Sequence, residues 1–142
     1  MKEKTPQASV LYLTPAMAVM SVAVLATAAD GHWSKKEIER LRMMAHLQPL
    51  FRDIPSVEKF IGSRAADLRA VGPKVLIEDC RKALTPRMRE TAYAWAVDLV
   101  QSDGAAVSAE HIFLQELAVK FAIPGPLARK LQTAAAAPRR TA

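Results

Sequence analysis

Cysteine, glycine and aromatic residues are all scarce in this chain of 142 residues. Its one cysteine, Cys80, excludes an internal disulfide and a metal site built from several thiolates. Catalytic and nucleotide-binding motifs are also missing, since the chain contains no G-x-x-x-x-G-K-S/T, G-x-S-x-G, H-E-x-x-H or C-x-x-C. Enzyme status has no positive support, and we expect a protein that is not an enzyme.

Most of the chain has little net charge, although the whole chain is basic at +6 with a pI near 9.8. Residues 129–142 carry a net charge of +4 and residues 1–9 a net +1, whereas residues 10–128 hold 14 basic and 13 acidic residues. Basic segments attract nucleic acid and anionic membranes. Binding of either through the basic termini is therefore one hypothesis for function, although the chain shows no aromatic and basic stacking surface.

Strand-like alternation of useful length is absent, and apolar residues instead recur at helical spacing. Met88, Trp95 and Leu99 share one helical face, and Phe113, Leu117 and Phe121 share another. With 51% hydrophobic residues, the chain is long enough for one domain with a core. We predict an all-α, single-domain bundle of about seven helices. The expected parts are an N-terminal arm (1–12), a helical domain (13–131) and a disordered basic tail (132–142).

Glycine and proline mark the expected helix breaks. Pro55 begins a short helix that Gly62 interrupts, and Gly72-Pro73 begins the next one. The six methionines, including Met43 and Met44, are interpreted as filler of the core.

The first thirty residues have two interpretations. Lys2 and Lys4, an apolar run and then Ala26-Thr27-Ala28 resemble an export signal peptide with its cleavage site, which would remove residues 1–28. However, Thr14-Pro15 is typical of a helix N-cap followed by the first helical residue. The apolar stretch is also shorter than the roughly 20 residues that span a bilayer. We favour a buried first helix, with export as the alternative.

The chain repeats a helix–turn–helix pattern. Leu-Thr-Pro opens an apolar helical stretch at residues 13–15 and again at 84–86, and each stretch ends in Asp-Gly, at 30–31 and at 103–104. An offset of 73 residues aligns Leu41 with Leu114, whereas the two Leu-Thr-Pro openings are 71 apart, so the second leading helix is two residues longer. The pattern predicts two pseudo-symmetric helix–turn–helix repeats.

Each repeat carries two carboxylates near its turn. Asp30 and Glu37 belong to the first copy, and Asp103 and Glu110 to the second. If a pseudo-twofold axis brings the four together, their hard oxygen atoms suit Ca²⁺ or Mg²⁺. The alternative is structural, because Asp before Gly is ordinary in turns and Glu is favoured in a first helical turn by the helix dipole.

The paired motif, residues 26–31 with Ser34 and Glu37 and then residues 102–104 with Glu110, resembles the TerB-like tellurite-resistance family. The same helical domain occurs in the DjlA co-chaperone family. The resemblance covers residues 13–131. It implies an all-helical, cytoplasmic bacterial accessory or scaffold domain that works through unidentified protein partners in a tellurite or general stress response. It also implies divalent-cation binding at Asp30, Glu37, Asp103 and Glu110.

Other polar residues have simpler interpretations. Cys80 lies on an apolar stripe and is interpreted as a small buried hydrophobic residue, with a reactive thiol as the alternative. His46 and His111 are expected to be exposed, and His32 and Trp33 to belong to the first turn.

Overall fold

The computed structural model describes residues 12–28, 35–100 and 108–140. These residues form six α-helices and a short 3-10 helix, and none of them lies in a strand. In chain order the elements are α1 (Pro15–Thr27), α2 (Lys35–His46), η1 (Pro49–Phe51), α3 (Val57–Ala83), α4 (Pro86–Val100), α5 (Ser108–Lys120) and α6 (Gly125–Arg140). The predicted all-α class is confirmed for this part of the chain, with six α-helices where about seven were expected.

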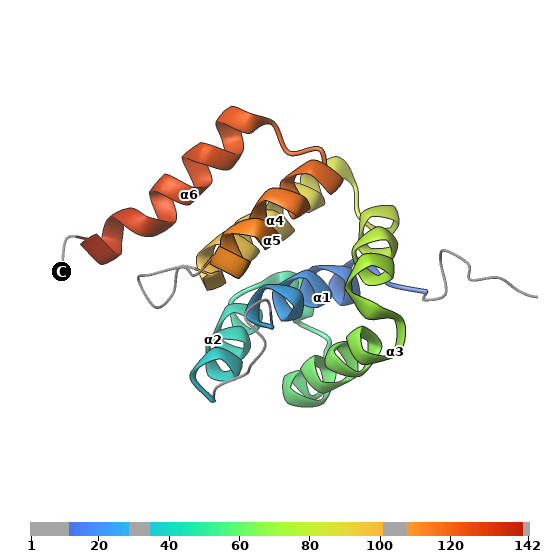
Figure 1. The fold of residues 1–142 in the computed structure, drawn as a ribbon. Coiled ribbons are helices and arrows are strands. Elements are labelled where there is room, and N and C mark those ends of the chain that lie inside the picture. The colour runs from blue at the N-terminus through green and yellow to red at the C-terminus, as the bar shows by residue number, and fades with distance from the viewer. Residues whose placement is uncertain (1–11, 29–34, 101–107, 141–142) are drawn as a thin grey trace, which may run out of the picture.

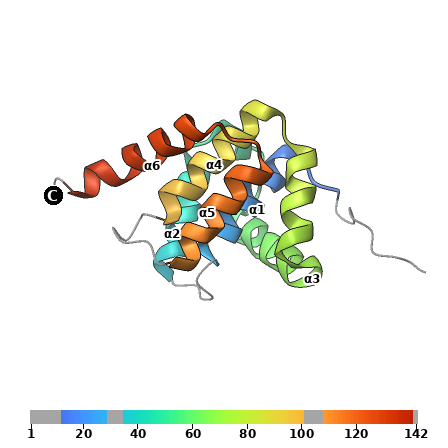
Figure 2. The same cartoon turned by 45° about the horizontal axis from the view of Figure 1, so that its top comes forward.

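α1 is the central helix of the bundle, between α3 and α4 (Figures 1 and 2). Every residue from Ala18 to Thr27 is buried. A helix that is apolar on all sides has no face to offer to water, so it is stable only when other helices surround it. The apolar run that resembled a signal peptide thus forms the middle of the core in this structure. Among the helices that the structure describes, none is both long and apolar enough to cross a lipid bilayer.

The two Thr-Pro pairs begin helices as predicted. The hydroxyl of Thr14 accepts a hydrogen bond from the backbone N–H of Met17 at 3.2 Å, and that of Thr85 accepts one from Met88 at 3.2 Å. In each case a proline follows, whose fixed φ suits the first helical residue and whose missing N–H would have had no helical partner. The local sequence therefore sets where α1 and α4 start.

Each Leu-Thr-Pro is followed by two helices, α1 and α2 in the first copy and α4 and α5 in the second. The packing differs between the copies, because α5 packs against α4 whereas α2 packs mainly against η1 and α3.

α3 bends sharply at Gly72, where φ is 83° and ψ is 164°. Only glycine adopts this backbone conformation readily, and Pro73 then supplies the fixed φ of a new first turn. The predicted break at Gly72-Pro73 is therefore present as a kink within one helix. The predicted interruption at Gly62 is wrong, since α3 continues through this residue with helical geometry.

Two other differences concern α6 and the methionines. α6 ends at Arg140, beyond residue 131 where we expected the helical domain to end. Of the methionines interpreted as core, Met20 is fully buried, whereas Met43 is 59% exposed. Met43 lies on the outer face of α2, so its interpretation as core filler is wrong.

Candidate functional site

Two of the four predicted metal ligands lie in the described part of the chain. Glu37 is the third residue of α2 and is half-buried, and Glu110 is the third residue of α5 and is only 8% exposed. Asp30 and Asp103 lie outside the described residues. Within the described ranges, no three His, Cys, Asp or Glu side chains are grouped so that they could hold a metal ion.

The two glutamates alone fall short of a cation site. A divalent cation such as Ca²⁺ takes about 6–8 oxygen ligands, and Mg²⁺ keeps several water molecules. Both Glu37 and Glu110 also have partners within the protein already. The fit of a cation thus depends on the two Asp-Gly turns, and the cation site stays a prediction.

The single thiol lies in the core. The side chain of Cys80 is fully buried, and its Sγ donates a hydrogen bond to the backbone carbonyl of Ala18 at 3.5 Å. Burial raises the pKa of Cys80 to about 12, which outweighs the opposing hydrogen bond with Ser21. A thiol that stays protonated and out of contact with solvent is not a nucleophile. The interpretation of Cys80 as a small buried hydrophobic residue is confirmed.

Both histidines in the described residues follow the sequence prediction. His46 and His111 are both exposed, as predicted, whereas His32 and Trp33 lie outside the described residues. On α6, Arg129 and Lys130 are exposed as neighbours.

A first groove lies where α2, η1 and the start of α3 meet. It consists of two adjoining cavities of about 550 and 530 Å³, which share four lining residues: His46, Leu47, Pro55 and Val57. Leu47 is 79% exposed at this groove, and Met43 lies beside it. On the rim, Arg42 donates a hydrogen bond to Glu39 at 2.9 Å. Apolar and polar side chains both line this groove, and charges of both signs lie around it.

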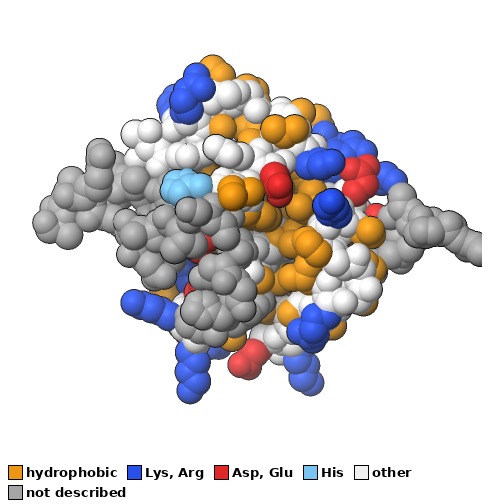
Figure 3. All heavy atoms as spheres, viewed as in Figure 1, with side chains coloured by type: hydrophobic (Ala, Val, Ile, Leu, Met, Phe, Trp, Pro, Cys, Tyr) orange, Lys and Arg blue, Asp and Glu red, His pale blue; other side chains and the backbone are white. Residues whose placement is uncertain are grey.

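A second groove lies between α5 and the kinked α3. Two cavities of about 500 and 440 Å³ make it up, and both are lined by Glu116. The first also has Lys74, Ile77, Gln115, Val119 and Lys120 along it. The second has Leu25, Ala28, Leu68, Pro73, Ile112 and Phe113. Figure 3 shows hydrophobic side chains in the middle of the face that carries α5, with Lys and Arg side chains beside them.

The outer face of α5 carries apolar residues that were not predicted from the sequence. Ile112 is 54% exposed and Val119 is 78% exposed, on the opposite side from the buried Leu114 and Leu117. Their spacing of seven residues places them on one stripe of the helix, two turns apart. That spacing was visible in the sequence and would have indicated a second apolar face.

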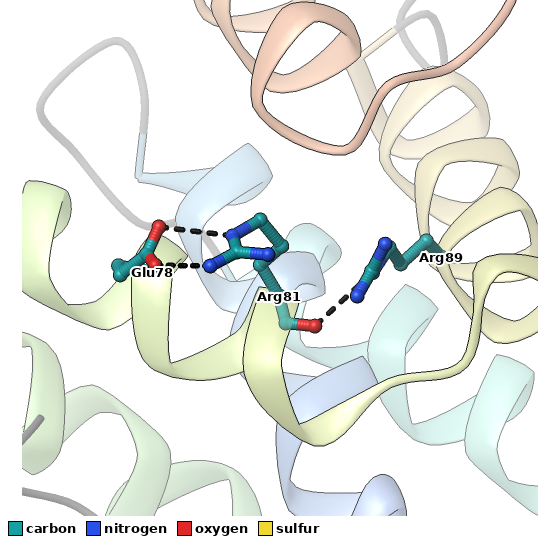
Figure 4. Close-up of polar contacts among 3 residues, drawn as sticks. All are labelled: Glu78, Arg81 and Arg89. Carbon is teal, nitrogen blue, oxygen red and sulfur yellow. Dashed lines mark hydrogen bonds and ion pairs between the residues drawn. The ribbon is translucent and has the colours of Figure 1, made fainter.

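Near this groove, an ion pair within α3 lies beside a hydrogen bond that joins the end of α3 to the start of α4 (Figure 4). The guanidinium of Arg81 donates hydrogen bonds to both carboxylate oxygens of Glu78, and the backbone carbonyl of Arg81 accepts one from Arg89 Nε at 3.1 Å. The hydrogen bonds from Arg81 lower the pKa of Glu78, with smaller contributions from the charges of Lys82 and Lys120. Glu78 is thus an acid already paired within a basic neighbourhood.

No family model matches the chain, and neither a curated protein nor a solved structure matches it. The resemblance to the TerB-like family therefore rests on the paired motif alone.

Proposed function

We propose that this protein is a TerB-like helical accessory or scaffold protein of the cytoplasm, which acts in a tellurite or general stress response by binding another protein. The supporting observation is the exposure of large apolar side chains beside the two grooves: Met43, Leu47, Ile112 and Val119. Apolar patches on the surface of a soluble domain are typical of interaction sites. The protein carries out no chemistry in this proposal.

The proposal includes a pseudo-symmetric pair of helix–turn–helix units that hold a divalent cation. Support comes from the order of helices after each Thr-Pro start, and from Glu37 and Glu110, each of which lies in the first turn of its helix. Asp30 and Asp103 supply the remaining carboxylates of the four. Binding of Ca²⁺ or Mg²⁺ would then stabilise the two turns and modulate the contact with the partner.

Titration calorimetry tests the cation. We expect heat from Ca²⁺ or Mg²⁺ with the wild-type protein and none with an Asp30→Ala/Asp103→Ala variant. A Glu39→Ala variant is the matched control, since Glu39 is an exposed acid of α2 that pairs with Arg42. Absence of heat with the wild type, or equal heat with the double variant, contradicts cation binding.

Survival on tellurite tests the biological role. We expect loss of the gene in the source organism to lower survival, and the wild-type gene to restore it. Complementation with a gene that encodes Val119→Asp or Leu47→Asp then shows which groove is needed, because both side chains are exposed and tolerate a charge. Unchanged survival without the gene contradicts the proposed role.

A second candidate function is the binding of nucleic acid or an anionic membrane through the basic ends. The exposure of Arg129 and Lys130 on α6 favours it. Affinity for a DNA duplex or for anionic vesicles should then fall with salt and fall further in an Arg129→Gln/Lys130→Gln variant. Equal affinity in this variant excludes α6 as the binding element.

A further inference from the structure

The groove between α3 and α5 has a defined polarity. At one end lie Ile112, Phe113 and Leu68, which are apolar. At the other end lie Lys74 and Lys120, and neither of them forms an ion pair with another described residue. The carboxylate of Glu78 nearby is held by Arg81. The groove therefore offers apolar surface at Ile112 and Val119, interrupted by polar residues of α5, and a net positive charge at one end, where two lysines outnumber Glu116.

The fold itself creates this polarity. The kink at Gly72 turns the second half of α3, so that Lys74, just after the kink, lines the same cavity as Val119 and Lys120 of α5. Along α5 the exposed apolar residues are seven positions apart, which is ~10 Å at 1.5 Å per residue. The stripe between them is not covered by any described helix, because Ile112 and Val119 remain more than half exposed.

We propose that this groove binds an acidic amphipathic helix of the partner protein, with apolar side chains over Ile112 and Val119 and carboxylates paired with Lys74 and Lys120. The inference rests on the proposed function, because it names the class of partner that the scaffold binds. A helix laid in a groove between two helices uses apolar residues at a spacing of three, four and seven. That spacing matches the two turns between Ile112 and Val119.

A helix fits this groove better than an extended segment does. An extended peptide needs a strand edge to satisfy its backbone N–H and C=O groups, and the described residues contain no strand. A helix satisfies those groups internally and presents only side chains. Glu116, on the rim between the two cavities, is expected to face a basic or neutral residue in the middle of the partner helix.

Charge argues against a second copy of this chain as the occupant. Its own outer helices carry exposed Lys35 and Lys36 on α2 and exposed Arg129 and Lys130 on α6, while the exposed Arg42 of α2 is already paired with Glu39. These side chains would approach Lys74 and Lys120 with like charge, which opposes association. An acidic helix meets the same lysines with opposite charge.

Selection from a displayed library of 16-residue peptides with amphipathic patterning tests the proposal on the full-length protein. The peptides that bind should have apolar residues at helical spacing and acidic residues at one end. Fluorescence anisotropy with a selected peptide should show roughly tenfold weaker binding to Val119→Asp. At low salt, a Lys74→Glu/Lys120→Glu variant should bind the peptide at least as weakly as Val119→Asp does. Its affinity should also lack the salt dependence that the wild type shows.

Leu47→Asp is the matched control. Leu47 is 79% exposed and Val119 is 78% exposed, so the two substitutions place the same charge at equally exposed apolar sites in different grooves. Binding to Leu47→Asp should stay within about twofold of the wild type. Circular dichroism should show the same helix content in all variants, since each changed side chain is exposed.

Several results would overturn the inference. Selected peptides that lack acidic residues contradict the charge match with the two lysines. Equal binding to Val119→Asp, or loss of binding with Leu47→Asp, places the interaction outside this groove. Each of these results leaves the proposed scaffold function in place. Binding to phosphatidylglycerol vesicles that is lost in the double lysine variant, with no peptide selected, assigns the groove to lipid. Unchanged survival on tellurite, by contrast, contradicts the stress role and leaves the groove inference intact.

Discussion

Gln132 donates a hydrogen bond from Nε2 to the hydroxyl oxygen of Tyr93 at 3.0 Å, and this bond joins α6 to α4. Tyr93 is fully buried and is the largest of the fully buried side chains. Its hydroxyl needs a partner, because a buried polar group without one costs free energy. The sequence predicts neither member of this pair, since the two residues are 39 positions apart and lie in helices that are separate in the chain.

Removing the partner of Tyr93 should weaken the attachment of α6. We expect Gln132→Ala to lower the free energy of unfolding by about 1 kcal/mol. Tyr93→Phe should have a similar effect, and the double variant should cost less than the sum of the two. Urea unfolding of the four proteins measures this coupling. Thr133→Ala, at the next and exposed position of α6, is the control and should change stability little.

The two glycines of α3 should respond oppositely to substitution by alanine. Gly72 has a φ of 83°, and no atom lies within 4 Å of an added Cβ, so the cost there is one of backbone conformation alone. Gly72→Ala should lower the free energy of unfolding by about 1–3 kcal/mol. Gly62 has equal space in a regular helix, and Gly62→Ala should raise stability by up to about 1 kcal/mol. Thermal unfolding compares the pair, and a stabilising Gly72→Ala would contradict the kink.

These glycines also show what local sequence can predict. Gly72 precedes a proline, and the pair predicts a break because proline fixes φ and disfavours helical geometry in the residue before it. Gly62 has no such neighbour. Its cost inside a helix is only about 1 kcal/mol, which the burial of Ile61 beside it offsets. The start of α1 at Thr14-Pro15 was predictable for the same reason as the break at Gly72, because each depends only on residues adjacent in the sequence.

Properties that depend on packing were harder to predict. The sequence places Met43 and Met44 next to each other, but only the packing of α2 shows that the first is exposed and the second partly buried. The four carboxylates of the predicted cation site are a more demanding case. Their convergence depends on the distance between two turns in separate repeats, which helical periodicity does not determine. The prediction of Glu37 and Glu110 in first helical turns, by contrast, needed only the helix start.

The thiol of Cys80 should be unreactive in the folded protein. Because it is fully buried, 5,5′-dithiobis(2-nitrobenzoate) should label it only as fast as the protein unfolds, and urea should accelerate the labelling. Thr133→Cys in a Cys80→Ala background is the control, and its exposed thiol should react at once. Rapid labelling of native wild-type protein would contradict the burial of Cys80.

The same thiol should make stability depend on pH. Burial raises the pKa of Cys80 from its ordinary value of 9.0 to about 12. The unfolded chain therefore releases this proton at a lower pH than the folded protein does, and stability falls as pH rises from 9 towards 12. The slope should approach about 1.4 kcal/mol per pH unit. Unfolding free energies of the wild type and of Cys80→Ala should diverge in slope above pH 9 and run parallel below it.

Removal of residues 1–28 should destroy the fold. This deletion mimics cleavage of the proposed signal peptide and takes away α1, whose buried side chains contact both α3 and α4. The free energy lost with about ten buried apolar and small side chains exceeds the 5–15 kcal/mol by which a domain is typically stable. Circular dichroism should show a loss of cooperative unfolding in this variant. The expectation that residues 1–12 form an arm outside the domain predicts that their deletion leaves the unfolding midpoint unchanged. A stable, cooperatively folded protein without residues 1–28 would contradict the central role of α1 and favour the export alternative.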